Sequence, residues 1–212
     1  MKIVFFGDSI TDMGRRREYD DLSDAAFSYG VGYPLFIAGE LHGQPDKYEV
    51  INRGISGNTV VDLYARVQGD VWNHEPDVLS ILIGINDIWH QFSHNTGVKL
   101  DRYVKVYKAL LDETKQRFPN IKLVLCEPFV LKGCGTEAIY EQLLQVKDYA
   151  AAVKQIAEEY VAYFLYLQEA LTKATAAARP DAYLYDGIHP SAAGAKLLAS
   201  EWLKLFQEKI DK

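Results

Sequence analysis

The chain has 212 residues, of which 49% are hydrophobic and 25% are charged, and its formal net charge is −6. These values are ordinary for a globular protein, and the length suits one domain over residues 1–212 with a sizeable core. The negative net charge argues against general affinity for nucleic acid or for an anionic membrane surface. The one basic cluster, residues 15–17, is followed at once by acidic residues.

The first residues predict a buried strand. The apolar run 3–6 ends at Gly7, so it is shorter than the roughly 7–15 residues of a signal-peptide core and far shorter than a membrane span. The cytoplasm is therefore the expected location, with a removed signal peptide as the open alternative. Two free thiols, Cys126 and Cys134, are favoured over a disulfide between them. Neither has a His or Cys at ligand spacing, so no metal site is expected.

Short apolar runs alternate with longer helical patterns along the chain, as in strands that helices cover on both faces. The predicted strands are residues 2–6, 48–52, 78–83, 122–126 and 163–167. The predicted helices are residues 33–41, 60–67, 101–118 with Asp101 as N-cap, 139–160, and a last helix from Ser191, while residues 15–28 read as a long loop. This order predicts a three-layer α/β/α sandwich with a mostly five-stranded parallel sheet, as in flavodoxin-like folds.

Four polar motifs lie beside these predicted elements. Residues 7–11 (Gly-Asp-Ser-Ile-Thr) follow the first strand, residues 52–58 the second and residues 84–87 (Gly-Ile-Asn-Asp) the third. Residues 186–190 (Asp-Gly-Ile-His-Pro) precede the last helix. Because parallel strands end at the same edge of a sheet, where ligands bind in such folds, the first three motifs are expected to lie together.

The residue types in these motifs predict acyl transfer. The hydroxyl of Ser9 becomes a nucleophile when a base within hydrogen-bond reach takes its proton, and His189 titrates in the required range. Asp186 lies three residues earlier and can orient the imidazole. The backbone N–H groups of Ser9 and Gly57 and the side-chain amide of Asn86 can supply donors for a developing oxyanion.

In content and order the four motifs resemble those of the SGNH (GDSL-type) hydrolases, and they cover nearly the whole chain. This resemblance implies a serine ester hydrolase that requires no metal or organic cofactor. It implies that Ser9 is the nucleophile, that Asp186 and His189 complete a catalytic triad, and that Ser9, Gly57 and Asn86 form the oxyanion hole.

A closer resemblance is to the intracellular acetylxylan esterases of this superfamily. It implies removal of O-acetyl groups from xylo-oligosaccharides or related small sugars through an acetyl-enzyme on Ser9. The loops at residues 15–28 and 129–137 depart from the family and are expected to shape the sugar side of the site. The residues that carry the resemblance are 7–12 with Gly14 and Arg15, 30–33, 52–60 and 83–89.

Four further residues are candidates for contact with the substrate. Asp8 is favoured as a bracing hydrogen-bond acceptor, and Arg15 either holds a polar substrate or pairs with the acidic residues after it. Trp89 follows the Asn86 motif and is expected to contact the sugar, with His90 lining the pocket. Two other aromatic residues are predicted to be core residues, Phe92 and Tyr185.

Two other functions stay open. A lysophospholipase or thioesterase of the same fold would prefer longer acyl chains, which the polar segment after Thr11 disfavours. A non-catalytic flavodoxin-like module would cradle phosphate or a nucleotide at the first loop, but it leaves Asn86 and the Asp186–His189 pair unexplained. The expected partner is a small acetylated sugar, with no nucleic acid or membrane, and exposed aromatic residues leave a homo-oligomer open.

Overall fold

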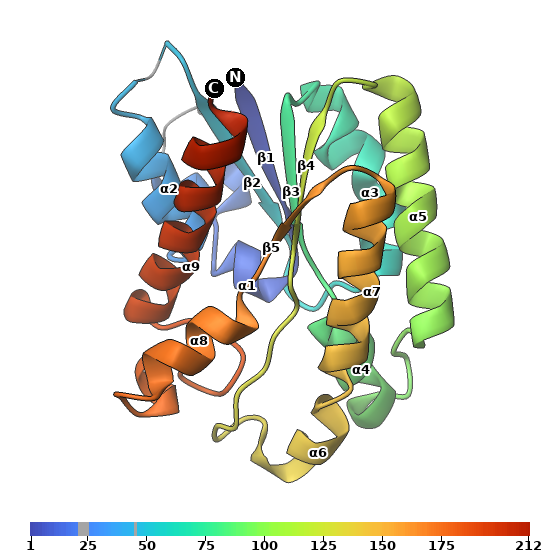
Figure 1. The fold of residues 1–212 in the computed structure, drawn as a ribbon, viewed down its shortest axis with the longest axis vertical. Coiled ribbons are helices and arrows are strands. Elements are labelled where there is room, and N and C mark those ends of the chain that lie inside the picture. The colour runs from blue at the N-terminus through green and yellow to red at the C-terminus, as the bar shows by residue number, and fades with distance from the viewer. Residues whose placement is uncertain (21–25, 45) are drawn as a thin grey trace.

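A computed structural model of the chain describes residues 1–20, 26–44 and 46–212. Five parallel strands form one sheet in the order β2-β1-β3-β4-β5 (Figure 1). All five predicted strands are confirmed, although the second ends later and the fifth ends earlier than expected. The strands are β1 (Lys2–Gly7), β2 (Glu49–Gly54), β3 (Val78–Leu82), β4 (Lys122–Cys126) and β5 (Tyr163–Leu165).

Helices cover both faces of the sheet, which confirms the three-layer α/β/α sandwich. Helices α2 and α9 pack together on one face, and α3, α5 and α7 lie on the other (Figure 1). The helices are α1 (Ser9–Asp12), α2 (Tyr33–Leu41), α3 (Val60–Asp70), α4 (Ile85–Ser93), α5 (Leu100–Arg117), α6 (Tyr140–Leu143), α7 (Val146–Glu159), α8 (Gln168–Thr175) and α9 (Ala192–Leu205). Within the described ranges, none of them is long and apolar enough to cross a membrane.

The strand order positions the site. The chain places β2 on one side of β1 and then crosses to place β3 on the other side. Gly7 pairs in register with both Gly54 and Leu82, so the three strands end level with one another. In open α/β sheets the crevice beyond such a switch in strand order is where ligands bind. The loops after β1, β2 and β3 therefore meet at one place.

The strands carry apolar residues at consecutive positions because both faces of the sheet are buried. Residues 3–6 of β1 are completely buried, because helices cover both faces of the sheet. On one face the ring of Trp202 lies edge-on to Phe5 with centroids 5.0 Å apart, and its indole N–H donates to Ser80 Oγ at 3.0 Å. On the other face Trp72 donates in the same way to Thr114 Oγ1 at 3.0 Å. Both buried indole N–H groups therefore have a hydrogen-bond acceptor, and these contacts help to fix the packing around the sheet.

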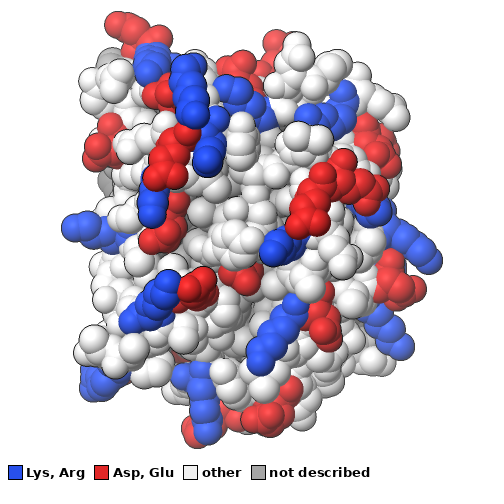
Figure 2. Space-filling view, viewed as in Figure 1, with Lys and Arg blue, Asp and Glu red and all other residues white. Residues whose placement is uncertain are grey.

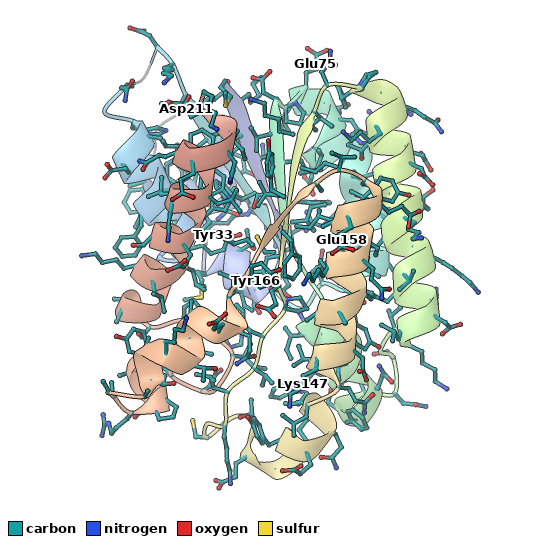
Figure 3. All side chains as sticks on the ribbon, in the orientation of Figure 1. Tyr33, Glu75, Lys147, Glu158, Tyr166 and Asp211 are labelled. Carbon is teal, nitrogen blue, oxygen red and sulfur yellow. The ribbon has the colours of Figure 1, made fainter. Side chains whose placement is uncertain are left out.

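The chain ends lie at the edge where the strands begin. Asp211 and Glu75 are at this edge, whereas Lys147 lies towards the opposite one (Figure 3). The carboxylate of Asp211 accepts hydrogen bonds from Tyr48 Oη at 2.5 Å and Lys47 Nζ at 3.0 Å, which holds the last turn of the chain against the start of β2. The edge where β1, β2 and β3 end is left for the polar motifs.

Several predicted helices differ in detail. The pattern over residues 139–160 forms two helices, α6 and α7, with a break at residues 144–145. Asp101 is not an N-cap, because α5 begins one residue earlier with Lys99 at that position. Asp101 instead lies in the first turn, where a carboxylate favours the helix dipole. Three helices were not predicted, the short α1 together with α4 and α8.

The predicted loop over residues 15–28 is only partly described. Residues 21–25 of this prediction lie outside the described residues. The remainder contains two short 3-10 turns, Arg17–Tyr19 and Ala26–Ser28. Basic and acidic side chains are interspersed over the face of the molecule drawn in Figure 2, without a broad basic area among the residues described there.

Candidate active site

Ser9 stands at the first position of α1, directly after β1. The turn is fixed by Asp8, whose Oδ1 accepts the backbone N–H of Ile10 at 3.0 Å and so caps the short helix. Ser9 is half-buried, and its Oγ lies 2.8 Å from Nε2 of His189, which comes from the far end of the chain. A hydroxyl and an imidazole at this distance can exchange a proton directly.

His189 is oriented by Asp186 within the turn that precedes α9. Asp186 Oδ2 lies 2.6 Å from His189 Nδ1. The other oxygen, Oδ1, accepts the backbone N–H groups of Ile188 at 2.9 Å and His189 at 2.8 Å. Because the carboxylate is acceptor-only, Nδ1 carries the hydrogen and Nε2 is left to accept from Ser9.

The same contacts set the protonation of the pair. The hydrogen bond that His189 donates to Asp186 raises the pKa of His189 above its ordinary value, against the opposing effect of partial burial. Burial of Asp186 acts to raise its own pKa, but the hydrogen bonds from the His189 ring and from two backbone N–H groups lower it overall. The aspartate therefore stays charged and supports an imidazolium when one forms.

The loop after β4 holds this turn in place. Leu131 N–H donates to Gly187 O at 2.8 Å, and Gly135 N–H donates to Asp186 O at 2.9 Å. On the outer side, the ring of Tyr185 stacks on the imidazole of His189, with centroids 5.8 Å apart and planes at 19°. The prediction that Tyr185 and Phe92 are core residues is wrong, because they are 51% and 43% exposed.

Three hydrogen-bond donors are predicted to form the oxyanion hole with Ser9. Within the described residues the backbone N–H groups of Ser9 and Gly57 donate to no backbone or side-chain acceptor. The Asn86 amide donates one hydrogen to the carbonyl of Asn58 at 3.0 Å, which orients the group and leaves the second hydrogen available. Gly57 has φ of 83°, a left-handed conformation that favours glycine, so the turn that presents its N–H depends on this residue.

Replacing Asn86 with alanine should lower kcat about 100- to 1000-fold, because the predicted oxyanion hole would lose one of its three donors. The KM for an aryl acetate should change little, since the interaction strengthens only in the transition state. Steady-state kinetics with an aryl acetate measure both constants. The exposed Asn73→Ala variant is the control, and an Asn86→Ala enzyme with the kcat of the unmodified protein would contradict this role.

Sequence reasoning missed the residues that hold the donor loops. Asp12 Oδ2 accepts both the backbone N–H of Ser56 at 2.9 Å and its hydroxyl at 2.8 Å. Arg66 donates to Gly7 O at 3.0 Å, to Arg53 O at 2.8 Å and to Asn58 Oδ1 at 2.7 Å. It thereby ties the ends of β1 and β2 to the loop that carries Gly57.

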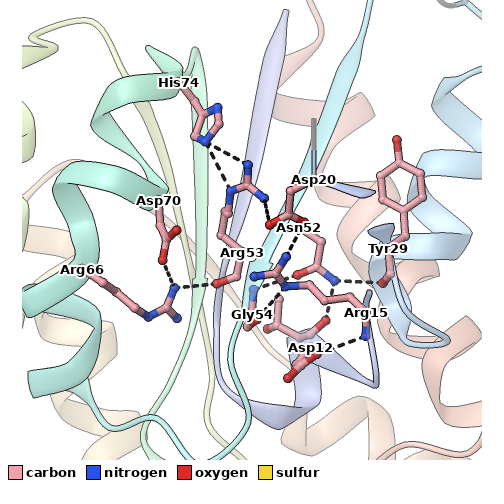
Figure 4. A network of polar contacts seen from close by, with 11 residues as sticks. Asp12, Arg15, Asp20, Tyr29, Asn52, Arg53, Gly54, Arg66, Asp70 and His74 are labelled. Carbon is pink, nitrogen blue, oxygen red and sulfur yellow. Dashed lines mark hydrogen bonds and ion pairs between the residues drawn. The ribbon is translucent and has the colours of Figure 1, made fainter. Parts of the chain in front are cut away.

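Two of the predicted substrate contacts are buried. Asp8 is completely buried, and Arg15 is 7% exposed. Arg15 donates to Gly54 O at 2.8 Å and pairs with Asp20 at 2.6 Å, and Arg53 pairs with the other oxygen of Asp20 at 2.7 Å (Figure 4). Because Asp8 and Arg15 are buried, the structure does not favour direct contact of either side chain with a substrate. The other interpretations, a bracing acceptor and an ion pair with the acidic segment, agree with these positions.

Trp89 and His90 are half-buried residues of α4. They follow Asn86 by three and four positions, so they lie on its side of the helix. Trp89 packs against the core, and the ring of His90 lies edge-on to His94 with centroids 5.3 Å apart. Burial, and then the neighbouring His94, lower the pKa of His90. Contact of either residue with substrate stays a prediction.

Across residues 1–20, 26–44 and 46–212, no group of three or more His, Cys, Asp and Glu side chains is arranged to hold a metal ion. A hydrogen-bonded series of serine, histidine and aspartate, beside unpaired donors at strand ends, is the arrangement found in serine hydrolases.

Comparisons with known proteins agree with this class. The model of the GDSL-like lipase/acylhydrolase family matches residues 5–197. An acetylxylan esterase from Geobacillus stearothermophilus is 39% identical over 96% of this chain and 92% of its own length. The chain belongs to the GDSL-like lipase/acylhydrolase family and is a carboxylic ester hydrolase.

Solved structures give the same picture. A protein described as a GDSL-like lipase from Parabacteroides merdae superposes with a TM-score of 0.90 at 36% identity, over 98% of this chain and 96% of that chain. A variant of the Geobacillus stearothermophilus acetylxylan esterase superposes with a TM-score of 0.84 at 37% identity, over 96% of this chain and 93% of that chain. The whole fold, including the edge that carries Ser9, is thus shared with these proteins.

Proposed function

We propose that this enzyme removes O-acetyl groups from small carbohydrate esters of the xylo-oligosaccharide type. The observation that carries the proposal is the hydrogen-bonded series Ser9–His189–Asp186, with Ser9 Oγ 2.8 Å from His189 Nε2. Its occurrence in a chain that is 39% identical to an acetylxylan esterase supports acetyl as the acyl group.

In the proposed reaction His189 Nε2 takes the proton of Ser9 as Oγ attacks the acetyl carbonyl carbon. The carbonyl oxygen becomes negative and is stabilised by the Ser9 and Gly57 N–H groups and the free hydrogen of the Asn86 amide. The tetrahedral intermediate collapses as the imidazolium gives its proton to the departing sugar oxygen. The acetyl group is then held as an ester on Ser9.

Water completes the cycle. His189 takes a proton from a water molecule that attacks the acetyl-enzyme, and a second oxyanion forms at the same donors. Collapse releases acetic acid, which ionises to acetate, and the proton on His189 returns to Ser9 Oγ. Asp186 remains charged throughout and stabilises the imidazolium in both halves.

Structures of the Geobacillus stearothermophilus esterase support these roles. Three of them are described as catalytic mutants of that enzyme, with a serine, a histidine, or an aspartate three positions before the histidine replaced by alanine. In this chain the same spacing separates Asp186 from His189, and both lie with Ser9 in one hydrogen-bonded series.

Acyl-chain length tests the substrate proposal. We expect kcat/KM to be highest for an aryl acetate and to fall through the butyrate to the octanoate. We also expect acetylated xylo-oligosaccharides to release acetate, which an acetate assay measures directly. Preference for the octanoate would replace the proposal with the lysophospholipase or thioesterase alternative, and Ser9→Ala controls for background hydrolysis.

The cytoplasm remains the proposed location. Both cysteines are unpaired, with Cys126 buried and Cys134 exposed, and a reducing compartment suits two free thiols. The proposed partner is the small acetylated sugar itself.

A further inference from the structure

An open groove of about 490 Å³ lies beside the turn of residues 186–189, here called the catalytic turn, and has no part in the reaction described above. One wall is the loop after β4, and the other is the segment that leads into the catalytic turn. The volume falls within the roughly 300–1,000 Å³ that is usual for small-molecule sites. The side chains that matter below are Lys132, Cys134 and Glu137 on the first wall and Asp181 and Tyr185 on the second.

Tyr185 joins this groove to the catalytic residues. Its ring stacks on the imidazole of His189 with centroids 5.8 Å apart, and the same side chain is 51% exposed and lines the groove. Backbone contacts hold it there, because Tyr185 N–H donates to His189 O at 3.0 Å and Cys134 Sγ donates to Tyr185 O at 3.6 Å. A molecule in the groove can therefore lie against an aromatic ring that itself contacts the catalytic base.

The loop that forms the first wall is fixed to the catalytic turn by its backbone. Gly135 N–H donates to Asp186 O at 2.9 Å. A Cβ atom at Gly133 would lie 2.5 Å from the backbone nitrogen of Gly187, and one at Gly135 would lie 3.0 Å from Asp186 O. Glycine at both positions therefore allows this close approach, which holds the groove in a constant place relative to His189.

The charges around the groove are balanced. Lys132 Nζ lies 3.5 Å from Glu137 Oε1, and Arg179 Nε lies 3.3 Å from Asp181 Oδ1. An anionic ligand such as phosphate would need unpaired cations, and a hydrocarbon chain would remove water from these charged groups. A neutral polyhydroxyl ligand suits the groove better, since its hydroxyl groups can bond to the charged side chains and its C–H face can pack on the ring of Tyr185.

The direction of the proposed reaction places the groove on the sugar side of the site. His189 gives its proton to the departing sugar oxygen, so this sugar must lie beside the imidazole. The acetyl group lies instead against the predicted oxyanion donors of Ser9, Gly57 and Asn86. A sugar chain that continues past the imidazole therefore reaches Tyr185 and then the groove.

We propose that this groove is a subsite for a sugar residue next to the one that carries the acetyl group, and that the ring of Tyr185 is its binding platform. This inference rests on the proposed function, because it takes the departing sugar to be part of a xylo-oligosaccharide. Occupation of the subsite raises kcat/KM for an oligosaccharide above that for a single acetylated xylose. Tyr185 thus determines specificity for the length of the sugar chain and not for the acyl group.

Tyr185→Leu tests the platform, because leucine keeps an apolar side chain but removes the aromatic face. The measured quantity, here called the length ratio, is kcat/KM for acetylated xylotetraose divided by kcat/KM for xylose acetylated at the same position. An effect of the substitution on His189 acts on both substrates and cancels in this ratio. We expect a length ratio well above one in the unmodified enzyme and a fall of about 2- to 10-fold in Tyr185→Leu, the effect of one aromatic contact. Tyr185→Phe keeps the aromatic face and should keep the ratio.

Tyr166→Leu is the matched control. Tyr166 is 50% exposed, close to the exposure of Tyr185, and its ring lies edge-on to Phe164 with centroids 4.8 Å apart. It follows β5 and is not one of the described residues that line the groove. Its variant should keep the length ratio of the unmodified enzyme.

Cys134 allows the groove to be filled without a substitution. Its side chain is exposed and lines the groove, whereas Cys126 is buried and burial raises the pKa of that thiol to about 12, so a thiol reagent reacts at Cys134. Benzyl methanethiosulfonate attaches a large group there, and methyl methanethiosulfonate attaches a small one. We expect the benzyl adduct to lower the length ratio at least as far as Tyr185→Leu does, and the methyl adduct to lower it less. Removal of either adduct by a reducing agent should restore the ratio.

These measurements separate failure of the subsite from failure of the proposed function. The inference is overturned if the length ratio of the unmodified enzyme is one, if a folded Tyr185→Leu enzyme keeps the unmodified ratio, or if Tyr185→Phe lowers it equally. The benzyl adduct decides the matter if Tyr185→Leu does not fold, and an unchanged ratio in this adduct also overturns the inference. A Tyr185→Leu enzyme that changes only its preference between aryl acetate and aryl octanoate would assign the groove to the acyl chain instead. An unmodified enzyme that releases acetate from neither sugar would overturn the proposed function itself.

Discussion

Replacing Ser9 with alanine is expected to reduce kcat/KM for an aryl acetate by about 10⁴- to 10⁶-fold, to the level that binding and the oxyanion donors alone sustain. The acetyl-enzyme cannot form without Oγ. The fold should persist, because the side-chain hydrogen bond of Ser9 is to His189 alone within the described residues, and Asp8 still caps α1. Initial rates of aryl acetate hydrolysis measure the loss, and the thermal unfolding curve confirms folding.

Ser200→Ala is the matched control for this experiment. Ser200 is an exposed serine of α9 whose hydroxyl donates to the carbonyl of Lys196 at 2.8 Å. Its removal should leave the rate unchanged. A folded Ser9→Ala enzyme that hydrolysed the aryl acetate at the same rate as the Ser200→Ala enzyme would exclude Ser9 as the nucleophile.

Replacing Asp186 with asparagine is expected to lower kcat about 10⁴-fold while leaving the turn intact. Asparagine can keep an oxygen at Oδ1, where the Ile188 and His189 N–H groups donate. It then directs an N–H towards His189 Nδ1. The imidazole must place its own hydrogen on Nε2, and that nitrogen can no longer accept the Ser9 proton.

The pH dependence gives a second signature of this change. Because Asp186 raises the pKa of His189, the acid limb of the residual activity should move to lower pH in Asp186→Asn. Asp181→Asn is the control, since Asp181 lies five residues earlier and pairs on the surface with Arg179 at 3.3 Å. An Asp186→Asn enzyme with the kcat of this control would remove Asp186 from the mechanism.

The position of the site was predictable because the motifs directly follow apolar strands. Residues 3–6 are buried on both faces, which requires a strand inside the sheet, so Ser9 had to lie at its end. The same argument applies to Asn86 after β3. The strand order could not be read from the sequence, because it depends on which helices pack on which face.

The support of the site was not predictable, because it comes from contacts between distant segments. Asp12 holds Ser56 across 44 positions, and Arg66 reaches Gly7 across 59. No local sequence pattern identifies either residue, because the partners of each are brought close only when the chain folds. Tyr185 was wrongly predicted as a core residue because an aromatic side chain beside apolar residues is usually buried, and here it stacks on His189 from the solvent side.

Helix α4 was missed for a different reason. Gly84, Asn86 and Asp87 are typical loop residues, so the segment after β3 resembled a turn. In the structure Gly84 is the N-cap, and Ile85 and Ile88 are buried at helical spacing. The motif residues are therefore held by a regular helix, which keeps the Asn86 amide in one position.

Labelling with a serine-directed phosphonate tests the central claim most directly, because it reports which hydroxyl is nucleophilic. The native enzyme is treated with the reagent, and mass spectrometry of the intact protein and of its peptides locates the adduct. We predict one adduct per chain, on Ser9, which is lost in Ser9→Ala and greatly slowed in Asp186→Asn. An adduct on another residue, or a native enzyme that stays unlabelled while it hydrolyses the aryl acetate, would contradict the account.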